Sequence, residues 1–178
     1  MKKLTMAFIF LVFITGTSVY AQRDNYSESH GRTLNLGVGI GGYSGYYGYI
    51  GRTLPILHIN YEFDVANSFT LAPFATFYTY RADNYRETVI PIGLKATFYF
   101  DQLLRANSNW DFYLGGSAGF AIVSSSWDNG YLGDRTYWHN PGNLFLDVHL
   151  GAEYHLSSNL GIFLDLSNGV STLGLAIH

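Results

Sequence analysis

Between Leu144 and Leu156 the chain contains thirteen residues in which every second side chain is apolar. The intervening positions hold four ionisable groups: Asp147, His149, Glu153 and His155. A period of two is that of a β-strand, because successive side chains point to opposite faces. The length exceeds the about five or six residues of a usual soluble strand. It suits a tilted strand that crosses a bilayer, which needs roughly nine to eleven.

The same alternation recurs along the chain and predicts eight strands joined by consecutive hairpins. Both faces of the third strand are apolar or aromatic, so the sequence does not decide which of them points into the barrel. The first, third, fifth and seventh connections are loops of about eleven, six, twenty and three residues, and the second, fourth and sixth are short or compact, as in outer-membrane barrels. One helical turn is expected between Asp101 and Asn109. The predicted strands cover residues 33–43, 55–65, 69–80, 87–100, 110–123, 144–156, 160–167 and 171–178.

The first 21 residues are expected to form a secretory signal peptide. Lys2 and Lys3 make its start basic, residues 4–14 are apolar apart from Thr5, and small or polar residues lead to Ala21. These three regions predict cleavage after Ala21, and the small-residue cleavage site disfavours the alternative, an N-terminal membrane anchor. Residues 22–32 are then a short periplasmic leader, and residues 33–178 form the barrel domain.

The composition excludes several classes of protein. The chain has no cysteine, so disulfides, metal thiolates and a lipid-modified cysteine are excluded. Without Lys2 and Lys3 it keeps eight basic and thirteen acidic residues and no basic patch, which argues against a nucleic-acid partner. Only 13% of the residues are charged, against about 25% in soluble domains. Low charge without an apolar run of membrane-helix length favours a membrane β-barrel.

Alternation alone leaves open which face of the barrel meets lipid. A soluble lipocalin-like carrier would place its apolar face inside. Here the apolar faces that can be phased carry no charge. The polar faces hold many small residues, which suit the crowded lumen of an eight-stranded barrel: Gly37, Gly39, Gly41, Gly93, Gly115, Ser117, Gly119, Gly151 and Gly161. Aromatic residues gather at the short-turn ends of the apolar faces, as an interfacial girdle requires: Phe63, Phe98, Phe100, Trp110, Phe112 and Tyr154.

These features resemble the small outer-membrane barrels of the OmpA/OmpX type. The segments "VYAQ" and "LNLGVGIGGY" are similar to those of barrels common in Bacteroidetes, the outer membrane protein beta-barrel domain family. The resemblance covers nearly all of the mature chain. It implies an all-β, antiparallel up-and-down transmembrane β-barrel of eight strands in the bacterial outer membrane. It also implies that the barrel is a monomer in contact with outer-membrane lipid.

Lys95 is the only lysine that remains after removal of the signal peptide, and it lies on an inward face. An unpaired charge in a narrow lumen is costly, so we expect Lys95 to pair with Glu62 or Glu153. The expected charge network contains Lys95, Glu62, Glu153, Asp147, His149 and His58. We interpret it as a salt-bridged plug, with a proton or ion path as the alternative.

Two further interpretations of the inward residues are weighed and not favoured. His58, His149 and His155 could bind zinc together with Glu62 or Glu153, but about 7 Å separates alternate residues of a strand. No metal or cofactor is therefore predicted. The segment "HLSSN" from His155 resembles the His-x-Ser segment of lipid A deacylases. That chemistry needs an outward site near the outer leaflet and a positioned acid, so the chain is not expected to be an enzyme.

The predicted outer loops are rich in exposed tyrosine and tryptophan, which are enriched in binding sites. Trp127, Tyr137 and Trp138 are the candidates for contact with an extracellular protein or a glycan. The favoured interpretation of the loop aromatics is interfacial anchoring and packing of the loops on themselves, and contact with a partner is the alternative. The sequence thus favours an envelope protein with a structural or recognition role, ahead of a lipid-modifying enzyme or a soluble lipocalin-like carrier.

Overall fold

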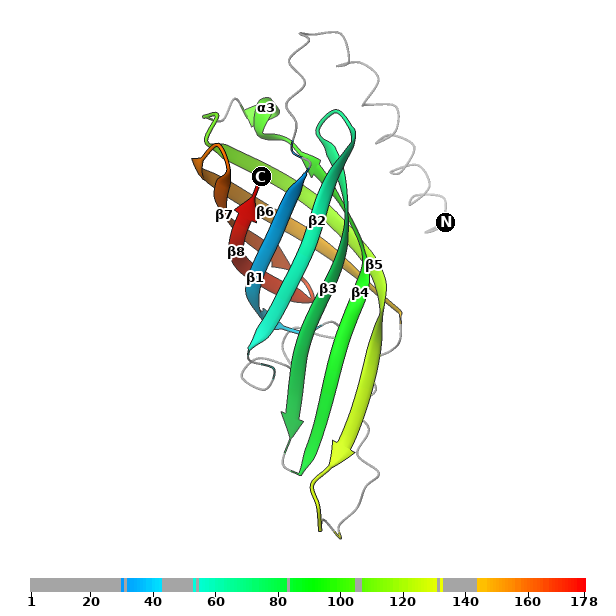
Figure 1. Ribbon diagram of the computed structural model, residues 1–178. Coiled ribbons are helices and arrows are strands. Elements are labelled where there is room, and N and C mark those ends of the chain that lie inside the picture. The colour runs from blue at the N-terminus through cyan, green and yellow to red at the C-terminus, as the bar shows by residue number, and fades with distance from the viewer. Residues whose placement is uncertain are drawn as a thin grey trace, which may run out of the picture.

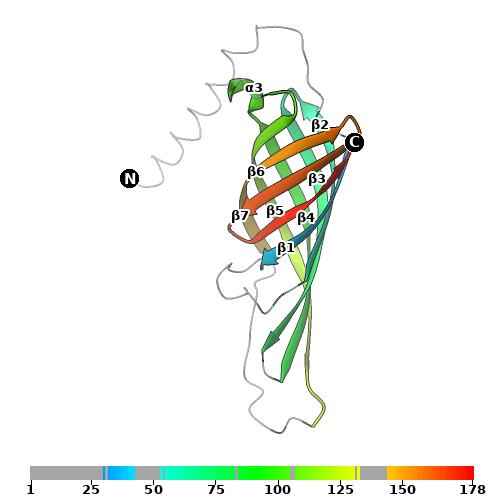
Figure 2. The same cartoon turned by 90° about the vertical axis from the view of Figure 1, so that its left-hand side faces the viewer.

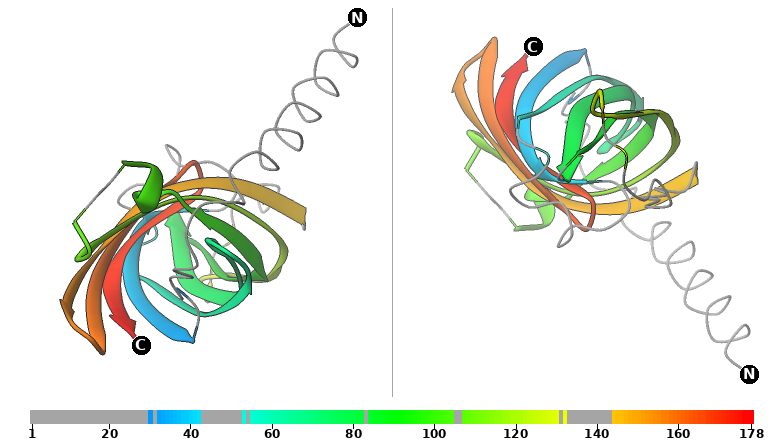
Figure 3. Two further views of the ribbon diagram at one scale, coloured as in Figure 1. Left: turned by 90° about the horizontal axis from the view of Figure 1, so that it is seen from above. Right: turned by 90° about the horizontal axis from the view of Figure 1, so that it is seen from below.

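The computed structural model describes residues 30, 32–42, 53, 55–82, 84–104, 107–130, 132 and 144–178. They form a closed antiparallel barrel in which each strand pairs with the next along the chain (Figure 1). β8 returns to β1 from Leu34↔Ile177 to Gly41↔Val170, and the end-on views of Figure 3 show the resulting ring. The strands are β1 (Thr33–Gly41), β2 (Ile56–Ala66), β3 (Phe69–Ala82), β4 (Tyr85–Tyr99), β5 (Trp110–Trp127), β6 (Leu144–Ser157), β7 (Leu160–Ser167) and β8 (Val170–Ile177).

All eight predicted strands are present, and the third hairpin is longer than predicted. Residues 81–86 were expected to be a loop, but β3 and β4 stay paired as far as Ala82↔Tyr85. β5 continues to Trp127 instead of ending at Val123, because Ser124, Ser125 and Ser126 pair with the first residues of β4. Serine and charged residues suggested loops, whereas cross-strand pairing decides how far these strands run.

The helical turn expected after Asp101 is α3 (Asp101–Leu104). Among the described residues, no helix is both long enough and apolar enough to cross a membrane.

The barrel wall has two unequal halves. β3, β4 and β5 contain 14, 15 and 18 residues, whereas β1, β7 and β8 contain 9, 8 and 8. The three long strands, here called the long wall, extend far beyond the others at one end (Figures 1 and 2). The opposite end is here called the short-turn end, because it carries the turns at residues 67–68 and 158–159 together with α3.

The apolar face points outward. On β6, Leu144 and Leu146 are 74% and 72% exposed, while the intervening Phe145, Asp147 and Glu153 are buried. The inward-apolar arrangement of a lipocalin-like barrel is therefore wrong for this chain. The structure also decides which face of the third strand points inward. Tyr78 and Tyr80 of β3 are buried in the barrel core, and Phe77 is exposed.

Outward aromatic residues at the short-turn end contact one another. The Trp110 ring stacks on Phe112 with centroids 5.8 Å apart and lies 4.9 Å from the Tyr154 ring across the β5–β6 pair. The Phe100 ring stacks on Phe112 at 6.5 Å. This row has the composition and position of the aromatic girdle that membrane barrels place at the interface.

Glycine makes room for larger side chains inside the barrel, as expected from the sequence. A Cβ atom on Gly151 would lie 2.1 Å from the Tyr113 ring, so the ring occupies the space above this glycine. A Cβ atom on Gly161 would lie 2.1 Å from Glu153 Oε1. The two glycines therefore set where a tyrosine and a carboxylate can lie in the lumen.

Candidate functional site

The middle of the lumen is occupied by a charge cluster centred on Asp165 of β7. Lys95 Nζ donates to Asp165 Oδ2, and the side chains of both residues are only 5% exposed. Tyr113 OH donates to the same oxygen at 3.1 Å, and His149 Nδ1 lies 2.7 Å from Asp165 Oδ1. Ser117 Oγ lies 2.8 Å from His149 Nε2. The Asp165 carboxylate thus joins groups from β4, β5 and β6, and we call this set the mid-lumen cluster.

The predicted partners of Lys95 are wrong. Sequence position placed Glu62 and Glu153 at the depth of Lys95, but the cation bonds to Asp165. The alternation of β7 places Asp165 on the inward face, but Asp165 is not part of the predicted network. Depth in a barrel depends on the tilt and stagger of the strands, which counting from strand ends does not supply.

Glu62 is held by neutral donors in a separate group. Asn35 Nδ2 donates to Glu62 Oε1 at 2.9 Å. Thr70 Oγ1 and Tyr99 OH donate to Glu62 Oε2 at 2.8 and 2.7 Å. Three hydrogen bonds satisfy this buried carboxylate, and within the described ranges no lysine or arginine pairs with it. None of these three donors was singled out from the sequence.

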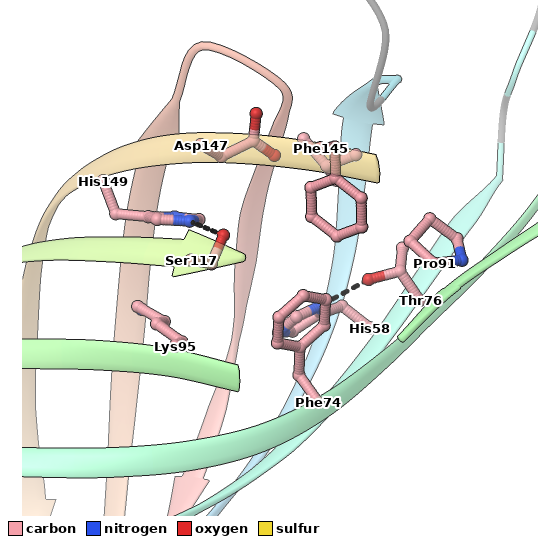
Figure 4. A pocket seen from close by; sticks show the side chains of 10 residues that line it. His58, Phe74, Thr76, Pro91, Lys95, Ser117, Phe145, Asp147 and His149 are labelled. Carbon is pink, nitrogen blue, oxygen red and sulfur yellow. Dashed lines mark hydrogen bonds between the residues drawn. The ribbon is translucent and has the colours of Figure 1, made fainter. Parts of the chain in front are cut away.

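His58 faces the mid-lumen cluster across a small cavity, which Asp147 also lines (Figure 4). His58 Nδ1 lies 2.8 Å from Thr76 Oγ1, and Asp147 lines the cavity beside His149. The cavity volume is about 30 Å³, enough for one or two water molecules. Four of the predicted network residues, Lys95, Asp147, His149 and His58, therefore surround one narrow space.

Beyond this cavity, toward the long loops, the lumen is filled by a hydrophobic core. Its buried members are Ile56, Tyr78, Tyr80, Tyr85, Val89, Ala121 and Phe145. Phe74 packs against this core, with its ring centroid 6.0 Å from that of Phe145. Side chains thus fill the described lumen above and below the cavity, as expected for eight strands.

A third group, here called the short-turn-end cluster, consists of Glu153, His155, His178, Asp111 and Thr33. His178 Nε2 lies 2.7 Å from Glu153 Oε1, and this hydrogen bond raises the pKa of His178 above its ordinary value. His155 Nδ1 lies 3.9 Å from the same oxygen, while His155 Nε2 lies 2.9 Å from Asp111 Oδ2. Thr33 Oγ1 lies 3.0 Å from His178 Nδ1.

The sequence did not predict this cluster. His178 and Thr33 lie at strand ends, where alternation says little about direction. His30, in the predicted leader, also joins the group. Its Nδ1 lies 3.3 Å from Asp111 Oδ2, and its ring stacks on Tyr99 with centroids 4.0 Å apart. The signal that could have found the group is the concentration of inward carboxylates and histidines toward the short-turn ends of β5 and β6, where Asp111, Glu153 and His155 lie.

The histidines that were weighed as a zinc site are split between two places. His58 and His149 line the mid-lumen cavity, whereas His155 belongs to the short-turn-end cluster. The "HLSSN" segment likewise lacks an outward histidine, because His155 is bonded to Asp111 inside the barrel. The three histidines therefore do not converge on one metal site, and the "HLSSN" segment does not present its histidine to lipid.

Of the three predicted loop contacts, the described residues include only Trp127. It is the last residue of β5 and lies in a strand, with its ring 5.0 Å from that of Tyr85 on β4. The expectation that Trp127 belongs to the longest loop is therefore wrong. Tyr137 and Trp138 lie outside the described residues.

No protein-family model and no curated protein matches the sequence. Among solved structures, the barrel is similar to Neisserial surface protein A with a TM-score of 0.54 and 16% identity, covering 82% of this chain and 92% of that one. A de novo designed transmembrane β-barrel gives 0.47 and 14%, covering 84% and 98%. Ail, the attachment invasion locus protein of Yersinia pestis, gives 0.41 and 13%, covering 82% and 94%. The first likeness shows the fold, an eight-stranded barrel of outer-membrane type.

Proposed function

We propose that this chain is a monomeric bacterial outer-membrane barrel with a structural or recognition role at the cell surface, without enzymatic activity. The observation that carries this proposal is the inverted barrel itself. Its outward face is apolar and edged by stacked aromatic rings, and its lumen is filled by charged and polar side chains and, toward the long wall, by a hydrophobic core. An apolar exterior of this kind is stable only in lipid.

Location is the first thing to test. The full chain, expressed in a Gram-negative host, should fractionate with the outer membrane and migrate differently on gels before and after heating. The mature protein should begin at Gln22 if the signal peptide is cleaved as predicted. Recovery in the soluble periplasm would contradict the proposal and favour a soluble carrier.

The filled lumen supports a role other than transport. A cavity of only about 30 Å³ lies between the charge cluster and the hydrophobic core, which supports a plugged lumen. In planar bilayers, wild type and Lys95→Ala should both lack large open-channel currents. Steady large currents from the wild type would overturn the plug interpretation and support the ion-path alternative.

The long wall supports recognition at its far end. Asp128 and the turn residues Asn129 and Gly130 directly follow β5, one of the three strands of this wall, and are exposed. An epitope inserted between Asn129 and Gly130 should bind antibody on intact cells, whereas one inserted between Ser158 and Asn159 should not. Labelling at the second position alone would reverse the proposed orientation.

The identity of the partner rests on the loop aromatics. We propose that Tyr137 and Trp138 contact an extracellular protein or a glycan. A Tyr137→Ala/Trp138→Ala variant should lose binding on an array of purified glycans and matrix proteins, while Leu132→Ala serves as a loop control. Resemblance to the Bacteroidetes barrels remains a prediction that homologous sequences can test.

The absence of activity is also a proposal. His155 is bonded to Asp111 at the short-turn end of the barrel, which in the proposed orientation is the end away from the outer leaflet. Mass spectra of lipid A from cells with and without the protein should be identical. A change in acylation would favour the lipid-modifying alternative.

A further inference from the structure

Three potential metal ligands converge at the short-turn end. Glu153 and His155 lie two residues apart on the inward face of β6, and His178 directly follows β8. One ligand atom from each, a carboxylate oxygen or a ring nitrogen, lies within 4.8 Å of the others. Two histidines and one glutamate are a ligand set found in zinc sites, with a fourth position left for water.

Each histidine forms one hydrogen bond to a residue other than Glu153, and its second ring nitrogen faces Glu153. His155 Nε2 lies 2.9 Å from Asp111 Oδ2, and an ionised carboxylate only accepts, so the proton belongs to His155 Nε2. In the neutral ring, His155 Nδ1 then carries the lone pair, and it is the nitrogen that faces Glu153. A carboxylate behind a histidine is the usual support of a histidine that ligates zinc.

His178 is oriented in the same way by Thr33. The Thr33 hydroxyl donates to the carbonyl oxygen of His30 at 3.1 Å, so toward His178 Nδ1 it must accept. His178 Nδ1 therefore carries a proton, and His178 Nε2 faces Glu153 Oε1. The His178 backbone N–H also donates to the Asn159 carbonyl at 3.2 Å, which fixes the residue after the strand.

The spacing suits a zinc ion with small adjustments. Ligand atoms in a tetrahedral zinc site lie about 3.4 Å from one another, since each is about 2.1 Å from the metal. From Glu153 Oε1 the distances to His178 Nε2 and His155 Nδ1 are 2.7 and 3.9 Å, one shorter and one longer than this spacing. Small side-chain rotations would equalise them.

Charge at this end of the lumen favours a cation. Glu62, Asp111 and Glu153 are all buried there. Within the described part of the chain, no lysine or arginine pairs with any of the three, because their partners are histidines and neutral donors. A divalent ion would compensate this negative charge directly.

The site can be reached, and the sheet leaves room for it. The side chains of His155 and His178 are 24% and 21% exposed, and a surface pocket lined by His30, Asp111 and His155 opens beside them. Between β6 and β8 the sheet position belongs to Gly161, which pairs with His155 on one side and Ala176 on the other. Because Gly161 has no side chain, residues of β6 can meet His178 across β7.

We propose that Glu153, His155 and His178 bind a divalent transition-metal ion of the zinc class, with Asp111 and Thr33 as positioning residues. The ion would tie the end of β8 to β6 across β7. Binding would replace the proton that His178 Nε2 now shares with Glu153, so the exchange is one metal ion for one proton at that nitrogen.

Zinc titration of the full mature barrel tests the proposal. The protein should be untagged, refolded in detergent in the presence of EDTA, dialysed, and titrated with zinc chloride against a chromophoric chelator. We expect about one zinc ion per chain and an increase in the unfolding temperature on zinc addition. His178→Gln and Glu153→Gln should abolish both effects, and Asp111→Asn should weaken binding roughly 10- to 100-fold.

His58→Gln is the matched control, because His58 is a lumen histidine outside the cluster, and it should bind zinc like the wild type. Heat-modifiable migration shows that each variant is folded, and His155→Gln replaces any ligand variant that is not. Absence of stoichiometric binding by the wild type would overturn the proposal. Unchanged binding by folded His178→Gln, or equal loss in His58→Gln, would do the same.

Discussion

The mid-lumen cluster and the short-turn-end cluster solve the same problem in different ways. Both contain buried carboxylates in a closed barrel. In the middle, Lys95 supplies a permanent positive charge that Asp165 binds directly. At the short-turn end, the described partners of Asp111 and Glu153 are histidines, whose charge depends on a proton.

The difference follows the distance from water. A charge pair in the middle of a membrane barrel must be complete within the protein, because no solvent ion can replace a missing partner. Near the barrel end, water, protons and metal ions can reach the carboxylates. We therefore expect the mid-lumen cluster to contribute mainly to the stability of the barrel. We expect the short-turn-end cluster to exchange protons or metal ions with solvent, and the following variants test this contrast.

The largest effect should come from Lys95→Met. It leaves Asp165 buried with only His149 and Tyr113 as partners, and breaking a buried pair costs about 3–5 kcal/mol of unfolding free energy. Urea unfolding of the barrel refolded in lipid vesicles measures this loss. The double variant Lys95→Met/Asp165→Leu should recover part of it, and a double variant less stable than Lys95→Met would refute the explanation.

Arginine substitutions on the outward face should show how deep each of the two clusters lies in the membrane. Leu150, on the outward face of β6 next to His149, should lie near the midplane, so Leu150→Arg should cost about 2–4 kcal/mol. Leu156, at the short-turn end of the same strand, should tolerate arginine at about 0–1 kcal/mol. The same vesicle unfolding experiment applies, and equal costs would contradict the assigned depths.

The two glycines beneath the clusters should respond unequally. In Gly151→Ala the new Cβ meets the rigid Tyr113 ring, which donates to Asp165, so overpacking should cost about 1–3 kcal/mol. In Gly161→Ala the obstacle is the flexible Glu153 side chain near the open end, and the loss should be smaller. Unfolding midpoints of the two variants give the comparison, which fails if Gly161→Ala is the less stable.

The smallest effect should come from His178→Gln without metal. The His178 side chain is partly exposed, and ion pairs in contact with water contribute about 0–1 kcal/mol. Unfolding in EDTA should therefore differ little from the wild type. A loss as large as that of Lys95→Met would show that the two clusters do not differ as described.

The sequence was sufficient for the barrel and insufficient for its interior contacts. Alternation assigns Leu146 outward and Asp147 inward from local information alone, because each residue's face depends only on its strand. Small inward residues such as Gly151 then indicate a crowded lumen. Eight strands and their order follow from the same local pattern and from short connections.

Pairing across the lumen depends on geometry that no single strand contains. Lys95 and Asp165 are 70 residues apart, and their meeting requires the tilt and stagger of the closed barrel. The extension of β5 to Trp127 depends on its neighbour β4. His178 follows the last strand, where the pattern that located the other inward residues no longer applies.

The unequal strand lengths allow one side of the barrel to extend beyond the membrane. At about 3.3 Å per residue and a tilt of about 40°, the 18 residues of β5 rise about 45 Å, whereas an outer-membrane apolar band is about 25 Å tall. In an outer membrane, the far ends of β3, β4 and β5, which stay paired as far as Ala82↔Tyr85 and Tyr85↔Trp127, would stand well above the lipid headgroups. Three paired strands of this length would hold their far end at a set height above the lipid. A partner would then be contacted beyond the surrounding polysaccharide without a long flexible tether.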